Sequence, residues 1–219
     1  MSKVTRLNDF FDQIYYINLN SRPDRLSSIK EQLEMNNVTA KRVAGIQQKF
    51  SVKKKINNAE LGLILTQKLI LIDAIRNNYK SILILEDDAI FCTDFIYHFD
   101  AAVAELPDDW DLFYLGGQYW LAFPEKFSKH VSIANRILGS HALGIKSTVF
   151  ETMLNISNFS EAGDQTFADK QKDLKSYITK KTLIDQKDGI TSDIQKTNPH
   201  IHIKPFRWEI DKGRYTPPS

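Results

Sequence analysis

This sequence lacks the features that mark secreted, membrane-spanning or nucleic-acid-binding proteins. Its one cysteine, Cys92, rules out an intrachain disulfide, which fits a reducing compartment. The longest apolar runs, such as residues 61–65, are far too short to cross a bilayer, and residues 1–12 hold no secretory signal. A formal net charge of +2 gives none of the basic excess that nucleic-acid binding requires. We therefore expect a cytoplasmic protein with no transmembrane segment and no nucleic-acid partner.

The length and composition predict a chain with a substantial core. The 219 residues fit one large α/β domain or two small ones, and a hydrophobic content of 42% is enough to build a core. The chain shows no internal repeat and no clear linker. We expect a single domain over residues 1–219, in which the polar segment from about 173 to 219 forms a lid or an extension.

Segments typical of strands and helices alternate along the chain. Strands are expected at residues 14–19, 40–44, 82–85, 110–115 and 177–183, with a further extended segment at 136–145. Helices are expected at residues 21–35, 57–78, 93–105 and 147–155. Ser21 and Ser147 are candidate helix caps, and Asn57 with Glu60 forms a candidate capping box. This alternation predicts an α/β fold with a mostly parallel central sheet flanked by helices.

The most informative feature is an apolar run that leads directly into three acids. Residues 82–85, Ile-Leu-Ile-Leu, are typical of a strand buried on both faces, and Glu86, Asp87 and Asp88 follow at once. Ligands of open α/β sheets bind at the carboxyl ends of such strands. Three carboxylates there repel one another, and a magnesium, manganese or calcium ion would relieve the repulsion. The alternative is a strand that ends in a polar turn.

Within this acidic cluster, the pattern acid-any-acid assigns separate roles to the three side chains. On an extended segment Glu86 and Asp88 would share one face, with Asp87 on the other. Asp88 is the first candidate for a metal ligand between the protein and the diphosphate of a nucleotide-sugar. Glu86 would reach the metal through water or hold the ribose, and Asp87 would contact the sugar.

Five segments, in this order, resemble family 25 glycosyltransferases, which include lipooligosaccharide and collagen galactosyltransferases. They are residues 16–25 (YINLNSRPDR), 59–62 (AELG), 84–89 (ILEDDA), 110–117 (WDLFYLGG) and 140–143 (SHAL). The resemblance spans roughly residues 14–165. It implies a GT-A-like nucleotide-sugar-binding fold, a UDP-sugar donor, Mn²⁺ or Mg²⁺, and inverting transfer to a hydroxyl. The family usually carries Ser-His where this chain has Thr66-Gln67, and often Cys where it has Leu63.

Candidate donor-binding residues follow the first and fourth expected strands. Arg22 and Arg25 carry guanidinium groups suited to phosphate oxygens, although either could instead be a solvated helix residue. Gly116 and Gly117 would let the backbone approach a sugar closely, or would simply form a turn. Gln118 could bond a sugar hydroxyl.

Candidate acceptor-side residues lie later in the chain. Inverting transfer needs a base, and Asp164 is the candidate, with a helix N-cap as its alternative role. His141 would orient the acceptor or simply lie in a strand. His200 and His202 alternate in sequence, so that one of them, His202 in our assignment, could complete the metal site; the alternative is a pair of surface strand histidines.

These observations predict a metal-dependent glycosyltransferase that moves a hexose, galactose, from a UDP-sugar to an acceptor hydroxyl on a glycan or glycoconjugate, as in lipopolysaccharide biosynthesis. In this reading the segment from about 173 onward lies on the acceptor side. The alternatives are transfer of glucose or rhamnose, a catalytically inactive sugar-nucleotide-binding paralogue, which Gln67 alone favours, and a metal-dependent phosphohydrolase. The sequence does not indicate the oligomeric state.

Overall fold

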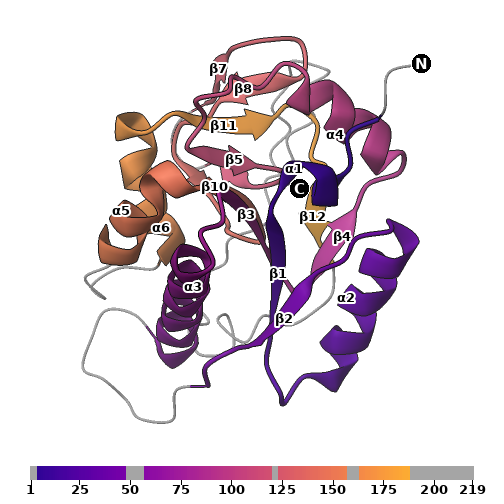
Figure 1. Ribbon diagram of the computed structural model, residues 1–219, viewed down its shortest axis with the longest axis vertical. Helices are drawn as coiled ribbons and strands as arrows, with labels where there is room; N and C mark the ends of the chain where they lie inside the picture. The colour runs from indigo at the N-terminus through magenta and orange to yellow at the C-terminus, as the bar shows by residue number, and fades with distance from the viewer. Residues whose placement is uncertain (1–3, 48–56, 120–122, 157–162, 188–219) are drawn as a thin grey trace, which may run out of the picture.

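Helices flank a central sheet of eight strands in the computed structural model (Figure 1). The structure describes residues 4–47, 57–119, 123–156 and 163–187. The predicted histidines His200 and His202 lie outside these residues, as does most of the extension expected from about 173 onward.

The central sheet runs in the order β2-β1-β3-β10-β5-β11-β8-β7. Its strands are β1 (Gln13–Asn18), β2 (Lys41–Ala44), β3 (Ser81–Glu86), β5 (Leu112–Tyr114), β7 (Glu125–Lys126), β8 (Val131–Ile133), β10 (Ala142–Lys146) and β11 (Ser176–Thr179). Pairing is parallel between β2 and β1, β1 and β3, and β5 and β11, whereas β10 is antiparallel to both of its neighbours and β8 to both of its own. All strands except β10 and β8 therefore point the same way, and the expected α/β sheet is confirmed.

Two short ribbons accompany the central sheet. In one, β4 (Ala89–Phe91) pairs antiparallel with β12 (Ile184–Gln186), and in the other, β6 (Gln118–Tyr119) pairs antiparallel with β9 (Ile137–Leu138). Both ribbons join a segment near the middle of the chain to one later in it.

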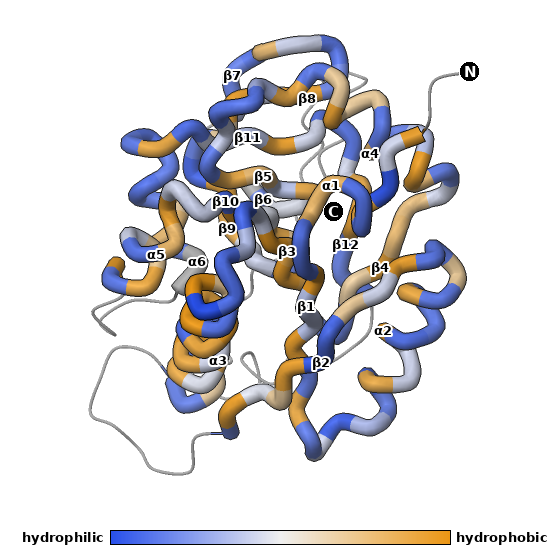
Figure 2. Tube along the Cα trace, in the orientation of Figure 1, coloured by the Kyte–Doolittle hydropathy of each residue, from blue (hydrophilic) through white to orange (hydrophobic). Residues whose placement is uncertain are grey.

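Strand β3 is buried on both faces, as its apolar run predicts. Leu83 and Leu85 pack in one core cluster, on the side of the sheet covered by α1 (Leu7–Phe10), α2 (Pro23–Met35) and α4 (Phe95–Val103). Ile82 and Ile84 pack in a second cluster, on the side covered by α3 (Asn58–Arg76), α5 (Phe150–Ile156) and α6 (Gly163–Lys170). Figure 1 shows these two groups of helices on opposite sides of β1 and β3, and Figure 2 shows that the trace of β3 is largely hydrophobic.

The helix boundaries confirm one predicted cap and correct two others. Asn57 accepts a hydrogen bond from the Glu60 amide and Glu60 accepts one from the Asn57 amide, so the capping box of α3 is confirmed. The caps assigned to Ser21 and Ser147 are wrong. Arg22 precedes α2 without a side-chain cap, since Pro23 already occupies the first helical position and needs no amide partner. Ser147 lies inside a short 3-10 helix (Ser147–Val149) that leads into α5.

Two segments expected to be continuous strands are interrupted. Within residues 136–145, Arg136 has a positive φ angle of 51° just before β9, and Gly139, with a φ angle of 90°, separates β9 from β10. The strand expected at 177–183 corresponds to β11, which follows a second 3-10 helix (Gln171–Asp173) and ends at Thr179. A new strand, β12, begins at Ile184. The described part of the predicted extension thus adds strands to the central sheet and to one of the ribbons.

Loss of the capping box should destabilise the fold measurably. Asn57→Ala leaves the amide of Glu60 without its acceptor, and we expect the free energy of unfolding to fall by about 1 kcal/mol. Urea denaturation followed by circular dichroism measures the change. Ser27→Ala, at an exposed position inside α2, is the control and should change stability by less than about 0.5 kcal/mol. An equal effect of the two substitutions would contradict the capping role.

Candidate active site

The three acids gather at the carboxyl end of β3, but not with the alternation expected from the sequence. The strand ends at Glu86, and Asp87 and Asp88 form a turn into β4. Side chains alternate between two faces only where the backbone is extended. The prediction that Glu86 and Asp88 share one face, with Asp87 on the other, is therefore wrong. Each carboxylate instead has a partner set of its own.

Asp87 makes a buried ion pair with Arg25 of α2. The Arg25 Nη1 atom lies 2.8 Å from Asp87 Oδ1, and the Asn18 side-chain amide donates to Asp87 Oδ2 at 2.7 Å. The same Nη1 atom lies 3.6 Å from Asp88 Oδ2. Both side chains of the Arg25–Asp87 pair are about nine-tenths buried. Arg25 therefore offsets part of the negative charge of the cluster, and Asp87 is held by protein groups.

Asn18 links this ion pair to a second arginine. At the end of β1, its side-chain oxygen accepts from Arg42 Nη2 at 2.9 Å, and the same nitrogen donates to Asn20 Oδ1 at 2.7 Å. Arg22, by contrast, pairs with the exposed Asp24 at 2.8 Å. That guanidinium lowers the Asp24 pKa to about 2. Arg22 and Arg25 therefore differ sharply: Arg25 joins the acidic cluster, and Arg22 forms an ion pair at the surface.

Glu86 is held by a chain of two hydrogen bonds that begins at the unusual Gln67. The Gln67 side-chain amide donates to Ser140 Oγ at 3.0 Å, and Ser140 Oγ donates to Glu86 Oε1 at 2.9 Å. Gln67 and Ser140 are both buried. Gln67, which stands where the family usually has His, therefore helps to hold Glu86 through Ser140. The neighbouring Thr66 donates to the Gly62 carbonyl within α3.

Strand β12 lies against Asp88 and leaves one carboxylate oxygen without a partner. The Lys187 amide donates to the Asp88 carbonyl at 2.9 Å, and the Gln186 side chain lies 3.5 Å from Asp88 Oδ2. Oδ1 of Asp88 is buried and has no hydrogen-bond partner among the described residues. Burial raises the pKa of Asp88 despite the nearby Arg25. An unpartnered buried carboxylate oxygen is the kind of group that a cation satisfies.

His141 lies beneath this region, 2% exposed, and binds protein groups. Its Nε2 atom donates to the Ile184 carbonyl at 3.1 Å, which ties β12 to the start of β10. Burial lowers the pKa of His141, so the imidazole is neutral, while the nearby Asp88 opposes that shift. His141 lies in the turn before β10 and is almost fully buried, and its expected role in orienting an acceptor stays a prediction.

Both glycines of the predicted sugar contact are packed against protein atoms. A Cβ atom at Gly116 would lie 1.8 Å from the Ile184 carbonyl oxygen, and one at Gly117 would lie 2.4 Å from the Ile137 side chain. The absence of side chains at these positions allows β12 and β9 to approach. Gln118 lies in β6, paired with Leu138 of β9.

Two predicted residues are not brought into the site by the described structure. The backbone of Asp164 lies at the start of α6, but its side chain is outside what the structure describes, and so is the whole of His202. The base and the histidine ligand therefore stay predictions.

The described residues fit a metal held mainly by its substrate. Among them, no three His, Cys, Asp or Glu side chains form a ligand set. Mg²⁺ sites commonly use one or two carboxylates and complete the coordination with substrate phosphates and water. Asp88, with its unpartnered Oδ1, fits that arrangement, with Glu86 beside it. The role of Asp88 as the first metal ligand stays a prediction, and its unpartnered Oδ1 atom is compatible with it.

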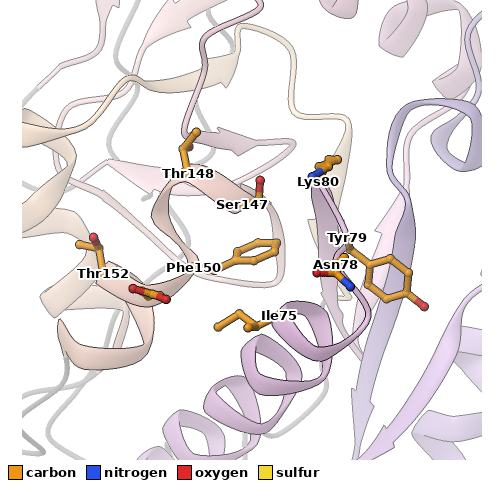
Figure 3. Close-up of a pocket in the computed structure, with 9 residues that line it drawn as sticks. Ile75, Asn78, Tyr79, Lys80, Ser147, Thr148, Phe150 and Thr152 are labelled. Atoms are coloured by element: carbon orange, nitrogen blue, oxygen red, sulfur yellow. The ribbon is translucent and has the colours of Figure 1, made fainter.

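A separate pocket of about 420 Å³ lies at the end of β3 opposite the acids (Figure 3). Lys80 and Ser147, in its lining, directly precede β3 and follow β10, at the ends of these strands farthest from the acids. The lining is largely exposed, with Phe150 at its base. Because the acids follow the carboxyl end of β3 and this depression lies at its amino end, the depression does not belong to the acidic cluster.

Sequence reasoning missed three residues of the site. Asn18 and Ser140 lie inside segments that carry the family resemblance, and this signal could have marked them as site residues. Their hydrogen-bond partners could not be found from the sequence. Gln186 belongs to no pattern, and only its pairing through β12 brings it to Asp88.

Comparison with known proteins identifies a family. The sequence model of Glycosyltransferase family 25 (LPS biosynthesis protein) matches residues 11–162, well over half of the chain. The match includes β1, α2, the acidic turn and the Ser140-His141 segment. No curated protein matches the chain.

Solved structures with a similar arrangement are distant in sequence. A197 from STIV is 13% identical, with a TM-score of 0.47, over 82% of this chain and 96% of that one. A glycosyltransferase involved in the glycosylation of the major capsid of PBCV-1 is 9% identical, with a TM-score of 0.38, over 67% of this chain and 66% of that one. Mannose-1-phosphate geranyltransferase from Thermus thermophilus is 6% identical, with a TM-score of 0.43, over 76% of this chain and 72% of that one. Among the described helices, none has the length and apolar character needed to span a membrane.

Removal of Arg25 should destabilise the protein far more than removal of Arg22. Arg25→Ala leaves Asp87 buried without its counter-charge, and breaking such a pair costs about 3–5 kcal/mol. Arg22→Ala removes an exposed ion pair and should change stability much less. Chemical denaturation of the two variants measures the contrast. Similar small losses in both would mean that the Arg25–Asp87 pair does not anchor the cluster.

The neutral state of His141 predicts how stability depends on pH. Because burial lowers its pKa in the folded protein, the unfolded chain binds the proton more readily, and stability falls as pH drops below about 6.5. One such proton contributes a slope of at most about 1.4 kcal/mol per pH unit. In His141→Gln the slope in this range should be shallower, as measured by denaturation at several pH values. An unchanged slope would show that other groups account for it.

Proposed function

We propose, from the premise that this chain belongs to glycosyltransferase family 25, that it transfers galactose from a UDP-sugar to a hydroxyl of a glycan or glycoconjugate. Family membership makes the chain a glycosyltransferase; the donor, the sugar, the metal and inversion at the anomeric carbon are our proposal. Its support is the unpartnered Oδ1 atom of Asp88, at the strand end where α/β sheets bind ligands.

Asp88 would hold Mn²⁺ or Mg²⁺ directly, and Glu86 would hold it through water. When bound, the cation offsets the charge that builds on the departing diphosphate. The protein's own contribution is to position Asp88. Among the described residues, Arg25 lies 3.6 Å from Oδ2 of this carboxylate and Gln186 lies 3.5 Å from the same oxygen, so Oδ1 is the atom left for a ligand.

The roles of the neighbouring acids follow from their partners. Asp87 is held by Arg25 and Asn18, so it anchors α2 against the turn, and contact with the sugar falls to other groups. Glu86 is oriented by Ser140 and Gln67. A carboxylate has about four lone-pair sites, so Glu86 can accept from Ser140 and also from a ribose hydroxyl or a metal-bound water.

The transfer itself needs a base on the acceptor side. The acceptor oxygen forms a bond to the anomeric carbon as the bond from that carbon to the diphosphate oxygen breaks, and the hydroxyl proton passes to a carboxylate. We assign this base to Asp164 from its position after the Ser140-His141 strand. His141, which donates to Ile184, acts through β12 as a positioning residue.

Of the alternatives, transfer of another hexose, such as glucose or rhamnose, differs only in the donor. The inactive paralogue was favoured by Gln67 alone, and that residue supports Glu86, which gives it a use in an active site. A metal-dependent phosphohydrolase remains distinct because it would release phosphate without any acceptor. A cytoplasmic location is also part of the proposal, supported by the single cysteine, Cys92, which fits a reducing compartment.

The carboxylate of Asp88 provides a test with two readouts. Since burial raises its pKa, its charge is unfavourable in the folded protein at neutral pH, and Asp88→Asn should raise the melting temperature. The same substitution should abolish the manganese-dependent rise in melting temperature produced by UDP-galactose. Thermal unfolding with and without Mn²⁺, against UDP-galactose, UDP-glucose and UDP, measures both effects.

Asp108→Asn, at an exposed position before β5, is the matched control and should retain the ligand-dependent shift. A shift that survives in Asp88→Asn would remove Asp88 from the donor site. Binding by the wild type of a UDP-sugar, followed by no transfer to any glycan acceptor, would favour the inactive paralogue. Phosphate release without an acceptor would favour the phosphohydrolase.

A further inference from the structure

A second, smaller pocket of about 140 Å³ lies away from the acidic cluster and has an unusual lining. Its walls come from α4, from the residues just before β8, and from the segment between β11 and β12. The residues that line it are His98, Ala102, Lys129, His130, Thr179, Lys180, Lys181 and Leu183. Every ionisable side chain among these described residues is basic.

An acid in contact with this lining is already engaged. Glu105, in the segment after α4, accepts a hydrogen bond from the His130 amide at 2.7 Å, and its other oxygen lies 4.0 Å from the His130 ring. Three lysines line the pocket, and no carboxylate is among the described residues of that lining. The surplus of positive charge at this pocket contrasts with the near-neutral net charge of the chain.

Two of the three ammonium groups, those of Lys180 and Lys181, are held in place by contacts with neighbouring elements. Lys180 donates to the Ser128 carbonyl, and the Lys180 amide donates to the His130 carbonyl at 2.9 Å. Lys181 Nζ lies 2.7 Å from His98 Nε2, which therefore accepts from it. An ammonium group carries three donors, so each of these lysines keeps hydrogens for a ligand. Cations held in advance lose less entropy when they bind an anion.

We propose that this pocket binds the phosphate group of a phosphate monoester. Its volume is well below the range of roughly 300–1,000 Å³ typical of sites for whole small molecules, so it suits a single substituent. A phosphate monoester carries close to two negative charges at neutral pH and three acceptor oxygens, which match clustered lysines. The Thr179 hydroxyl, also in the lining, donates to the Leu115 carbonyl at 3.4 Å, so the lysines supply the donors for the ligand.

The pocket is connected to the acidic cluster through β12. Leu183 lies in the pocket lining, and the next residue, Ile184, accepts the hydrogen bond from His141. Three residues further on, the Lys187 amide donates to the Asp88 carbonyl. An anion bound in the pocket therefore secures the segment that lies against Asp88. The phosphate site itself does not rest on the proposed transferase reaction.

Thermal unfolding of the full chain in inorganic phosphate tests the proposal, with potassium chloride added to keep the ionic strength constant. We expect a saturable rise in melting temperature, because a ligand that binds only the folded state stabilises it. Lys181→Gln and Lys129→Gln should each weaken phosphate binding by about tenfold or more. Lys30→Gln, an exposed charge change on α2, is the control and should bind as the wild type does.

A second arm replaces inorganic phosphate with glucose 6-phosphate. Tighter binding of this monoester supports recognition of a phosphorylated ligand, and equal binding supports recognition of the phosphate group alone. The proposal is overturned if chloride produces the same shift, or if both pocket variants bind phosphate as tightly as Lys30→Gln. Binding of UDP-galactose by Lys181→Gln should be unchanged, which separates this site from the donor site.

Discussion

The buried ion pair between Arg25 and Asp87 is the interaction on which the site depends. A strand that ends in three carboxylates cannot be buried without compensation, because charged groups lose their hydration and repel one another. Arg25 supplies that compensation from α2, at 2.8 Å from Asp87 and 3.6 Å from Asp88. The position of α2 on the sheet is thereby coupled to the geometry of the acidic turn. Asn18 extends the coupling to β1 and Arg42.

Strand β12 makes the second contribution, and it depends on two small features. Gly116 has no side chain that would clash with the Ile184 carbonyl, and His141 Nε2 donates a hydrogen bond to that carbonyl. Together they hold β12 where its last residues lie against Asp88. A neutral buried histidine and a glycine thus determine where β12 lies relative to Asp88.

The sequence was sufficient wherever a local pattern specifies the structure. The apolar run of β3, the capping box at Asn57 and the α/β alternation all follow from period, propensity and capping, and all are confirmed. The acidic cluster was located correctly for the same reason. What failed was the alternation of its side chains, since strand pairing ends at Glu86 and a turn follows. Partners such as Gln186 depend on contacts between distant segments, which no local pattern encodes.

The pairing of β12 with β4 also determines at what stage of synthesis and folding the site can form. Asp88 and Gln186 are separated by 98 residues, and Asn18 and Asp87 by 69. On the ribosome, the first βαβ unit and the acidic turn emerge well before β12 has been made. Contacts between distant segments form late and slow the folding of a chain. The nascent protein therefore passes through a stage in which Asp87 can already pair with Arg25 and Asn18, whereas Asp88 still lacks its contacts with Gln186 and Lys187.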